Sequence, residues 1–294
     1  MTALAPSASA AAAPPSLVVP APAKLNLFLH VTGRRADGYH TLESLFVALD
    51  FHDTLTLVRR DDGAIERATD LPGVPPEADL VVRAARALQQ ATLCRHGVTI
   101  GLVKRIPQGG GLGGGSSDAA SVLLGLNRLW ALGLPRADLM KIGLGLGADV
   151  PFFVFGAPAL ARGVGEDLVP VSLPRLWACV LAPAAIVPTA TVFAAPELTR
   201  DTPSAKISVF SEGYGRNDLQ AVAVARFPVI AAALALLGKR SPAARMTGSG
   251  ACVYALFANH SEARAALAAA RAEAPGMQGF VARLLDRHPL AAFA

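Results

Sequence analysis

Apolar and polar residues alternate along residues 23–31, a pattern typical of a β-strand with two different faces. One face would carry Leu25, Leu27, Leu29 and Val31, and the other Lys24, Asn26, Phe28 and His30. Asp37 and Gly38 follow as a hairpin-type turn. Similar patterns predict two further strands, at residues 46–58 and 97–106.

Helical periodicity, with apolar residues three and four positions apart, marks residues 77–91, 119–130 and 136–146. Residues 150–155 and 159–165 return to strand-like patterns. Beyond residue 172 the pattern predicts a strand at 177–182, helices at 218–226 and 227–237, a strand at 251–257 and a helix at 261–274.

This mixed order of strands and helices predicts an α+β fold. The length of 294 residues accommodates two domains of ordinary size. We expect a disordered tail at residues 1–20, rich in Ala, Ser and Pro, and two domains at residues 21–172 and 173–294.

The net charge is +5, and no run of basic residues is longer than two. Nucleic-acid-binding proteins usually concentrate basic charge on one face, so we expect no nucleic-acid partner. The mild basic excess suits an anionic small molecule instead. Hydrophobic residues make up 52% of the chain, which is ample for a core.

Three widely spaced cysteines, Cys94, Cys179 and Cys252, lie in apolar sequence and read as core thiols of a cytoplasmic protein. No Cys-x-x-Cys pattern proposes a metal site. Residues 1–23 lack the pattern of a signal peptide. The uncharged stretch 176–196 is interrupted by prolines, so we expect no membrane span. We expect the protein to be a monomer or a homodimer.

Residues 109–115 are all glycine except Leu112. This run follows the strand at 97–106 and leads into the helix at 119–130, with Ser116, Ser117 and Asp118 at the helix start. Glycines let the backbone approach a bulky ligand, and a helix N-terminus attracts phosphate. The alternative is a flexible linker followed by an ordinary helix cap. The position between a strand and an apolar helix favours a phosphate-binding loop.

Two well-known glycine patterns fit this loop less well. The Walker pattern is absent, because no Lys follows the glycines. Gly109, Gly111 and Gly114 match the dinucleotide pattern G-x-G-x-x-G, which also requires an acidic residue about 20 positions on, after a second strand. Asp138, the nearest candidate, lies at a predicted helix start. A dinucleotide-dependent oxidoreductase is therefore the weaker alternative.

Lys24 is the only charged side chain before Arg34, and Asp149 is the only one between residues 142 and 161. A buried charge needs a partner, and these two have opposite signs. A carboxylate kept ionised by a cation can take a proton from a substrate hydroxyl. The alternatives are an exposed Lys24 at a strand end and an Asp149 that only caps a turn.

A third glycine cluster lies at residues 247–251. Gly248 and Ser249 either form a second wall around a phosphate group or belong to a turn that enters the following strand.

Residues 22–29, 35–42, 107–120 and 146–152 together resemble the motifs of the GHMP superfamily of small-molecule kinases, named after galactokinase, homoserine kinase, mevalonate kinase and phosphomevalonate kinase. Residues 217–219 and 246–253 extend the similarity, which covers residues 21–260. It is closest to the members that act on 4-diphosphocytidyl-2-C-methyl-D-erythritol. The first two motifs are specific, whereas the glycine motif alone would not be.

The resemblance implies an N-terminal domain like the second domain of ribosomal protein S5 and a C-terminal ferredoxin-like domain, with the site between them. It implies that ATP, with Mg²⁺, phosphorylates the 2-hydroxyl of the cytidine diphosphate-linked methylerythritol. That step belongs to the non-mevalonate route to isopentenyl diphosphate. The remaining alternatives are another kinase of this superfamily and a non-catalytic nucleotide-binding protein.

By resemblance, Asp149 is the general base and Lys24 keeps it ionised and steadies the transferring phosphoryl group. The residues expected to wrap the ATP phosphates are Pro107, Gln108, Gly109, Gly110, Gly111, Leu112, Gly113, Gly114, Gly115, Ser116 and Ser117. Asp118 is harder to place, because a carboxylate repels phosphate unless Mg²⁺ lies between them or the side chain caps the helix.

The resemblance also assigns residues to the acceptor. Asn26 would lie beside the reacting centre. Tyr39 would stack on the cytosine ring and His40 would bind its edge, although a simple aromatic packing pair after the turn is the alternative. Thr189 and Phe193 would close the pocket from the second domain, with Gly248 and Ser249 nearby.

Overall fold

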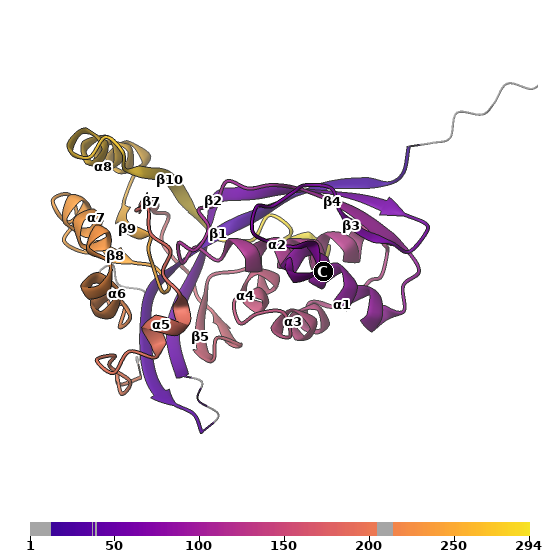
Figure 1. The fold of residues 1–294 in the computed structure, drawn as a ribbon, viewed down its shortest axis with the longest axis horizontal. Helices are drawn as coiled ribbons and strands as arrows, with labels where there is room; N and C mark the ends of the chain where they lie inside the picture. The colour runs from indigo at the N-terminus through magenta and orange to yellow at the C-terminus, as the bar shows by residue number, and fades with distance from the viewer. Residues whose placement is uncertain (1–12, 37, 39, 205–213) are drawn as a thin grey trace, which may run out of the picture.

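The computed structural model describes residues 13–36, 38, 40–204 and 214–294. The chain forms an elongated body in which one sheet connects two groups of helices (Figure 1). The long antiparallel strands β1 (Ser16–Arg34) and β2 (His40–Arg60) contribute to the cores of both halves. Asp37 of the predicted turn and Tyr39 lie outside the described residues.

In the N-terminal half, further strands pair around β2. They are β3 (Ile65–Arg67), β4 (Gly97–Val103), β5 (Ala159–Gly163) and β6 (Asp167–Pro170). The helices of this half lie together on one face of the sheet (Figure 1): α1 (Leu80–Thr92), α2 (Gly114–Leu129), α3 (Arg136–Leu144) and α4 (Val150–Phe155). The central helix is α2, whose residues 117–127 are all buried.

In the C-terminal half, β7 (Trp177–Ala182) pairs with β9 (Val253–Phe257) and with β10 (Gln278–Leu285), and β8 (Arg245–Met246) pairs with β9. Among the described residues, the α-helices of this half are α5 (Thr189–Phe193), α6 (Gln220–Arg226), α7 (Pro228–Gly238) and α8 (His260–Glu273). Leu284 and Leu285 of β10 also pair with β2 and join both halves in one sheet.

Two predictions need correction. Residues 16–20, expected in the tail, form the start of β1, because Val19 packs into the core and the segment pairs with β2. Residues 150–155, expected as a strand, form the helix α4. An apolar run that is buried on all sides shows no periodicity that would distinguish a helix from a strand. Pro151 in the first turn and Gly156 at the end, with φ of 81°, favour the helix.

The last residues of the chain return to the N-terminal half. Arg136 of α3 donates hydrogen bonds to the carbonyl oxygens of Ala291 and Ala294, at 2.7 and 2.9 Å. Asn127 of α2 donates to the carbonyl oxygen of Phe293 at 3.0 Å. The segment after β10 therefore packs on the first half, whereas the sequence analysis assigned it to the second domain. The domain boundary at residue 172 stays a prediction.

Within the described ranges, no helix taken singly has both the length and the apolar character needed to cross a bilayer. Only α6 and α7 combined, with a bend of 118° between them, reach those limits of length and composition.

We predict that His288 makes the fold sensitive to acid. Its ring is 3% exposed, and burial, together with Arg136, lowers its pKa from 6.5 to about 4. A lowered histidine pKa means that the folded state resists protonation, so stability is complete above about pH 6.5 and falls as the pH drops towards 4. The loss at pH 4 amounts to about 3 kcal/mol at most.

The test is urea unfolding at pH 7 and pH 4.5 for the wild type and His288→Asn. The amide oxygen of Asn can accept the hydrogen bond that Nδ1 of His288 accepts from the N–H of Leu290. The variant should lose less stability between the two pH values. An equal loss in both proteins would contradict the prediction.

Candidate active site

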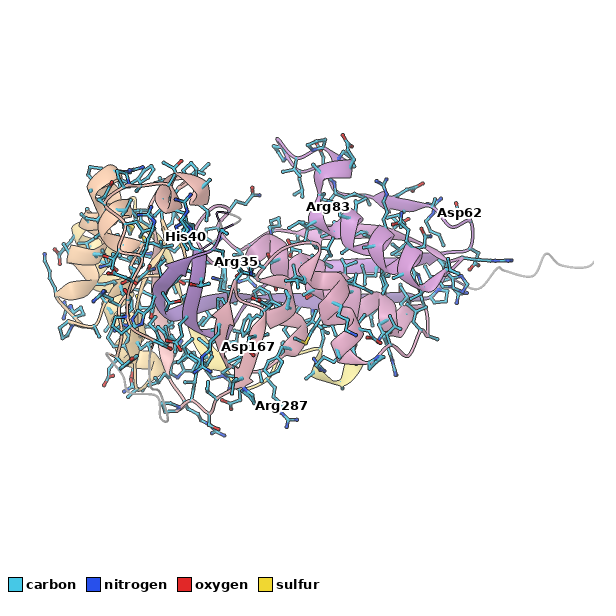
Figure 2. All side chains as sticks on the ribbon, turned by 90° about the horizontal axis from the view of Figure 1, so that it is seen from below. Arg35, His40, Asp62, Arg83, Asp167 and Arg287 are labelled. Atoms are coloured by element: carbon cyan, nitrogen blue, oxygen red, sulfur yellow. The ribbon has the colours of Figure 1, made fainter. Side chains whose placement is uncertain are left out.

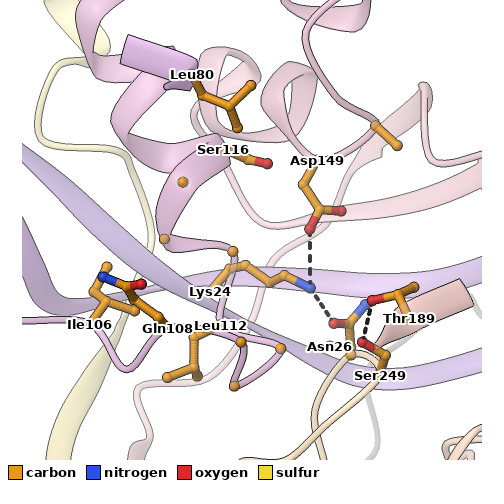
Figure 3. Close-up of a pocket in the computed structure, with 18 of the residues that line it drawn as sticks. Lys24, Asn26, Leu80, Ile106, Gln108, Leu112, Ser116, Asp149, Thr189 and Ser249 are labelled. Atoms are coloured by element: carbon orange, nitrogen blue, oxygen red, sulfur yellow. Dashed lines mark hydrogen bonds and ion pairs between the residues drawn. The ribbon is translucent and has the colours of Figure 1, made fainter. Parts of the chain in front are cut away.

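A pocket of about 640 Å³ lies where the two halves meet. Its wall combines β1, the glycine loop between β4 and α2, the start of α4, the helix α5 and the segment around Gly248 (Figure 3). Segments far apart in the sequence thus meet at one cavity.

The glycine loop accepts backbone hydrogen bonds from both halves of the protein. The N–H of Lys24 in β1 donates to the carbonyl oxygen of Leu112 at 2.9 Å, and the N–H of Cys252 donates to that of Gly110 at 3.1 Å. A methyl group on Gly110 would come within 2.6 Å of the sulfur of Cys252. Gly111 has φ of 77° and lies against the backbone of Thr247. Glycine is therefore required here for close approach of two backbones.

The loop ends at the N-terminus of α2, which begins at Gly114, earlier than the sequence pattern suggested. The cap residue Gly113 has φ of 71° and makes no side-chain capping bond. The first turn of a helix leaves N–H groups without intrahelical acceptors. Because residues 114–116 line the pocket, this helix end is suited to bind anionic oxygens.

Lys24 and Asp149 meet in the pocket, as the isolated charges suggested. The ammonium of Lys24 lies 3.5 Å from Oδ2 of Asp149 (Figure 3). Lys24 is 3% exposed, whereas the side chain of Asp149 is 33% exposed. Asp149 is the residue before α4, and its carboxylate makes no capping bond to that helix. It is therefore accessible to a ligand.

Asn26 holds Lys24 in place. Its Oδ1 accepts a hydrogen bond from the ammonium of Lys24, and its Nδ2 donates to the hydroxyl of Ser44 at 2.7 Å. Its backbone N–H donates to the hydroxyl of Thr247 at 2.9 Å. With 2% exposure, Asn26 lines the pocket mainly as a support for the ammonium.

Residues expected on the acceptor side come from the second half. Thr189, Phe193, Gly248 and Ser249 all line the pocket. The hydroxyls of Thr189 and Ser249 lie 2.8 Å apart and join α5 to the 247–251 segment. Asn217 supports that segment by donating to the carbonyl oxygens of Met246 and Gly248, at 2.9 and 2.8 Å.

His40 lies at the start of β2 beside the C-terminal half (Figure 2) and does not line the pocket itself. Its ring stacks on Phe193, with centroids 5.1 Å apart. Nε of Arg200 donates to Nε2 of His40 at 3.1 Å, so Nδ1 carries the proton of the neutral ring. Burial and Arg200 lower the pKa of His40. Arg200, which sequence reasoning missed, also binds the carbonyl oxygen of Phe193.

Other expected residues are not brought into the pocket wall. Ser117 is fully buried and lies outside the pocket lining. The role expected for Tyr39 falls outside the described residues. Pro107–Ser116 is the part of the predicted loop that lines the cavity. Among the described residues, no group of three His, Cys, Asp or Glu side chains is arranged to hold a metal.

Lys104 and Asp118 of the pocket wall form a second group of charges with Asp53, a grouping that the sequence did not predict. Lys104 binds the carboxylates of Asp53 and Asp118. Its side chain is 17% exposed, whereas those of Asp53 and Asp118 are at most 4% exposed. Ordinary surface charges such as Asp62, Arg83 and Arg287 instead point away from the body (Figure 2). The signal in the sequence was Asp53, one of two acidic residues, with Asp50, within the apolar strand pattern at 46–58.

Family models match two parts of the chain: GHMP kinases N terminal domain at residues 79–157 and GHMP kinases C terminal at residues 197–276. A curated 4-diphosphocytidyl-2-C-methyl-D-erythritol kinase of Cupriavidus necator is 57% identical over 280 residues, covering 94% of this chain and 95% of its own. One of Thiobacillus denitrificans is 58% identical over 275 residues, covering 94% and 98%.

The chain belongs to the GHMP kinase family. A crystal structure of 4-(cytidine 5'-diphospho)-2C-methyl-D-erythritol kinase superposes with a TM-score of 0.79 at 35% identity, covering 91% of this chain and 99% of that one. The predicted α+β fold of two GHMP kinase domains is thereby confirmed. As a GHMP kinase, the protein is a phosphotransferase that uses ATP and an alcohol acceptor.

We predict that Gly111→Ala destabilises this GHMP kinase and weakens ATP binding. The added methyl group would meet the carbonyl of Thr247 at a positive φ, at a cost of about 1–3 kcal/mol. Gly238→Ala is the matched control, because no atom of the described residues lies within 4 Å of its added methyl group and the residue, at the end of α7, does not line the pocket. Thermal unfolding and calorimetric titration with ATP measure both effects. Equal melting temperatures for the two variants would contradict this explanation of Gly111.

Proposed function

We propose that this GHMP kinase transfers the γ-phosphoryl group of ATP to the 2-hydroxyl of 4-diphosphocytidyl-2-C-methyl-D-erythritol. The step belongs to the methylerythritol phosphate route to isopentenyl diphosphate. The observation that carries the proposal is the Lys24–Asp149 pair beside the glycine loop, in a chain 57% identical to a kinase named for this substrate. We expect a cytoplasmic monomer or homodimer that needs neither nucleic acid nor a membrane.

Asp149 is the general base of this proposal. Its carboxylate removes the proton of the 2-hydroxyl, and the oxygen then attacks the γ-phosphorus while ADP leaves. The partial exposure of Asp149 gives an alcohol access to the carboxylate. The ammonium of Lys24 lies 3.5 Å from the same carboxylate and places positive charge beside the reacting oxygen.

Lys24 supplies positive charge where negative charge develops. Its ammonium is held by Asn26 and lies 5.0 Å from the centre of the Phe46 ring, so the side chain has little freedom. A fixed cation stabilises the transition state without rearranging during the reaction. Asn26 acts in this scheme by positioning Lys24.

The ATP phosphates are proposed to lie against residues 107–116 and the start of α2. N–H groups of the loop and of the first helical turn bind the phosphate oxygens, and the helix dipole favours their charge. Mg²⁺ enters as part of the Mg–ATP substrate, since ions of this kind are held largely by phosphates and water. No side chain of the chain is assigned to it.

The cytidyl group of the acceptor is proposed to lie near Phe193 and His40. The Phe193 ring offers a stacking face, and the Nδ1–H of His40 can donate to an acceptor atom of the base edge. Thr189 and Ser249 provide hydroxyls nearby. The role of Tyr39 as the second stacking ring remains part of the proposal.

The decisive experiment incubates the purified protein with Mg–ATP and 4-diphosphocytidyl-2-C-methyl-D-erythritol and identifies the 2-phosphate by mass spectrometry and phosphorus NMR. Mevalonate and homoserine are offered in parallel. Turnover of either one in preference to the cytidyl compound would assign a different GHMP kinase activity. Binding of ATP without any turnover would favour a non-catalytic nucleotide-binding protein.

Substitutions at the reacting centre should separate chemistry from binding. Asp149→Asn should lower kcat roughly 10²–10⁴-fold, the usual contribution of a positioned base. Lys24→Met should lower it roughly 10²–10³-fold through loss of an electrostatic donor. Asp138→Asn and Lys141→Met, which remove an exposed pair, are the matched controls. Wild-type kcat in either site variant would remove that residue from the mechanism.

Phe193→Ala should raise the KM for the cytidyl acceptor about 10-fold, because a stacked base contributes roughly 1–3 kcal/mol. The KM for ATP should stay unchanged, since Phe193 belongs to α5 and not to the glycine loop. Phe193→Tyr keeps the ring and serves as the control. Steady-state kinetics with each substrate varied in turn provide the measurement, and a rise in the KM for ATP alone would contradict this placement.

A further inference from the structure

The reaction scheme leaves three charges at the pocket wall or directly behind it without a role: Asp53 of β2, Lys104 after β4 and Asp118 of α2. Lys104 and Asp118 line the pocket, and Asp53 is fully buried behind them. The ammonium of Lys104 lies 2.6 Å from Oδ2 of Asp118 and also binds Oδ2 of Asp53. Buried ions are costly unless such contacts compensate them.

Asp53 orients the chain where the glycine loop departs from the sheet. Its Oδ1 accepts hydrogen bonds from the consecutive N–H groups of Arg105 and Ile106, at 2.5 and 2.8 Å. These residues directly follow β4 and precede Pro107. One carboxylate therefore sets both the path of the backbone into the loop and the position of the Lys104 ammonium.

Asp118 presents an electrostatic problem that Lys104 resolves. It is the fifth residue of α2, whose N-terminus is proposed to bind the ATP phosphates. Its Oδ1 is buried and has no hydrogen-bond partner among the described residues. Burial raises its pKa to about 7, with Asp53 adding to the rise and Lys104 opposing it. An uncompensated carboxylate at this position would repel a triphosphate.

The position of Lys104 suits this task. A methyl group on Gly114, the first residue of α2, would lie 3.3 Å from its ammonium nitrogen. The cation is therefore at the end of the helix that binds anions. The group of two carboxylates and one ammonium carries an excess negative charge when all three are ionised. Removing the charge of Asp118 would therefore make the site more favourable for phosphate.

We propose that Lys104 is a positioning residue of the nucleotide site, which ties the glycine loop to α2 and shields the ATP phosphates from the carboxylate of Asp118. This inference rests on the proposed function, in which the ATP phosphates bind at the glycine loop. In this proposal, Asp53 holds both the ammonium of Lys104 and the backbone of Arg105 and Ile106, where the chain enters the loop.

The test compares wild type, Lys104→Met, Asp118→Asn and the double variant. Isothermal titration with Mg²⁺ and a non-hydrolysable ATP analogue gives the Kd, and steady-state kinetics give the KM for the acceptor. Lys104→Met should weaken nucleotide binding about 10–100-fold, in line with the loss of a charged hydrogen bond. Asp118→Asn should instead strengthen it about 3-fold, because the amide keeps an acceptor for Lys104 and lacks the charge.

The double variant should bind the nucleotide more tightly than Lys104→Met, since the carboxylate that needs shielding has been removed. It should bind more weakly than Asp118→Asn, since the tie between the loop and α2 is lost as well. The KM for the acceptor should be unchanged throughout. The exposed pair Lys239 and Glu273, changed to Met and Gln, is the matched control and should leave nucleotide binding unaltered.

A purely structural role makes different predictions. It would lower the melting temperature of the single variants without strengthening nucleotide binding in Asp118→Asn. If Asp118→Asn weakens binding, or if the double variant binds no better than Lys104→Met, the proposal is wrong. If Lys104→Met fails to fold, the nucleotide Kd of Asp118→Asn still tests whether the carboxylate of Asp118 opposes phosphate binding. Failure of the wild type to bind the nucleotide would instead overturn the proposed phosphate site.

Discussion

Lys24 holds the glycine loop and the carboxylate of Asp149 in one rigid frame. Its backbone N–H binds the carbonyl oxygen of Leu112 in the loop, and its ammonium lies 3.5 Å from Asp149. Both contacts begin at one buried residue of β1, so a shift of the loop relative to Asp149 would break one of them. Phosphoryl transfer depends chiefly on positioning and charge neutralisation, and the rest of the site supports this residue.

The C-terminal half completes the frame through backbone and side-chain hydrogen bonds. Cys252 binds the carbonyl oxygen of Gly110, the Thr247 hydroxyl accepts from the N–H of Asn26, and Asn217 holds Gly248. The two glycine-rich segments meet backbone to backbone, which leaves no room for side chains between them. The support of the loop from both halves explains why the pocket lies at their junction, and why the buried ions there occur in compensated groups.

Much of this arrangement was predictable from local sequence. Alternation identified β1, the glycine run located the loop, and the isolation of Lys24 and Asp149 in apolar sequence marked them as partners. Local pattern failed at residues 150–155, where an apolar run buried on all sides forms α4. It also failed at residues 16–20, because the pairing with β2 that orders them is not visible in their composition.

The sequence alone determined which residues are candidates for the chemistry: a run of glycines, one isolated cation and one isolated acid. Beyond the Lys24–Asp149 pair, only the tertiary structure decided which charges compensate one another. Lys104 follows Asp53 by 51 positions and precedes Asp118 by 14, and Arg200 meets His40 from 160 positions away. The cost of burying a charge can be read from its apolar neighbours in the chain, but its partner is chosen by strand register and packing.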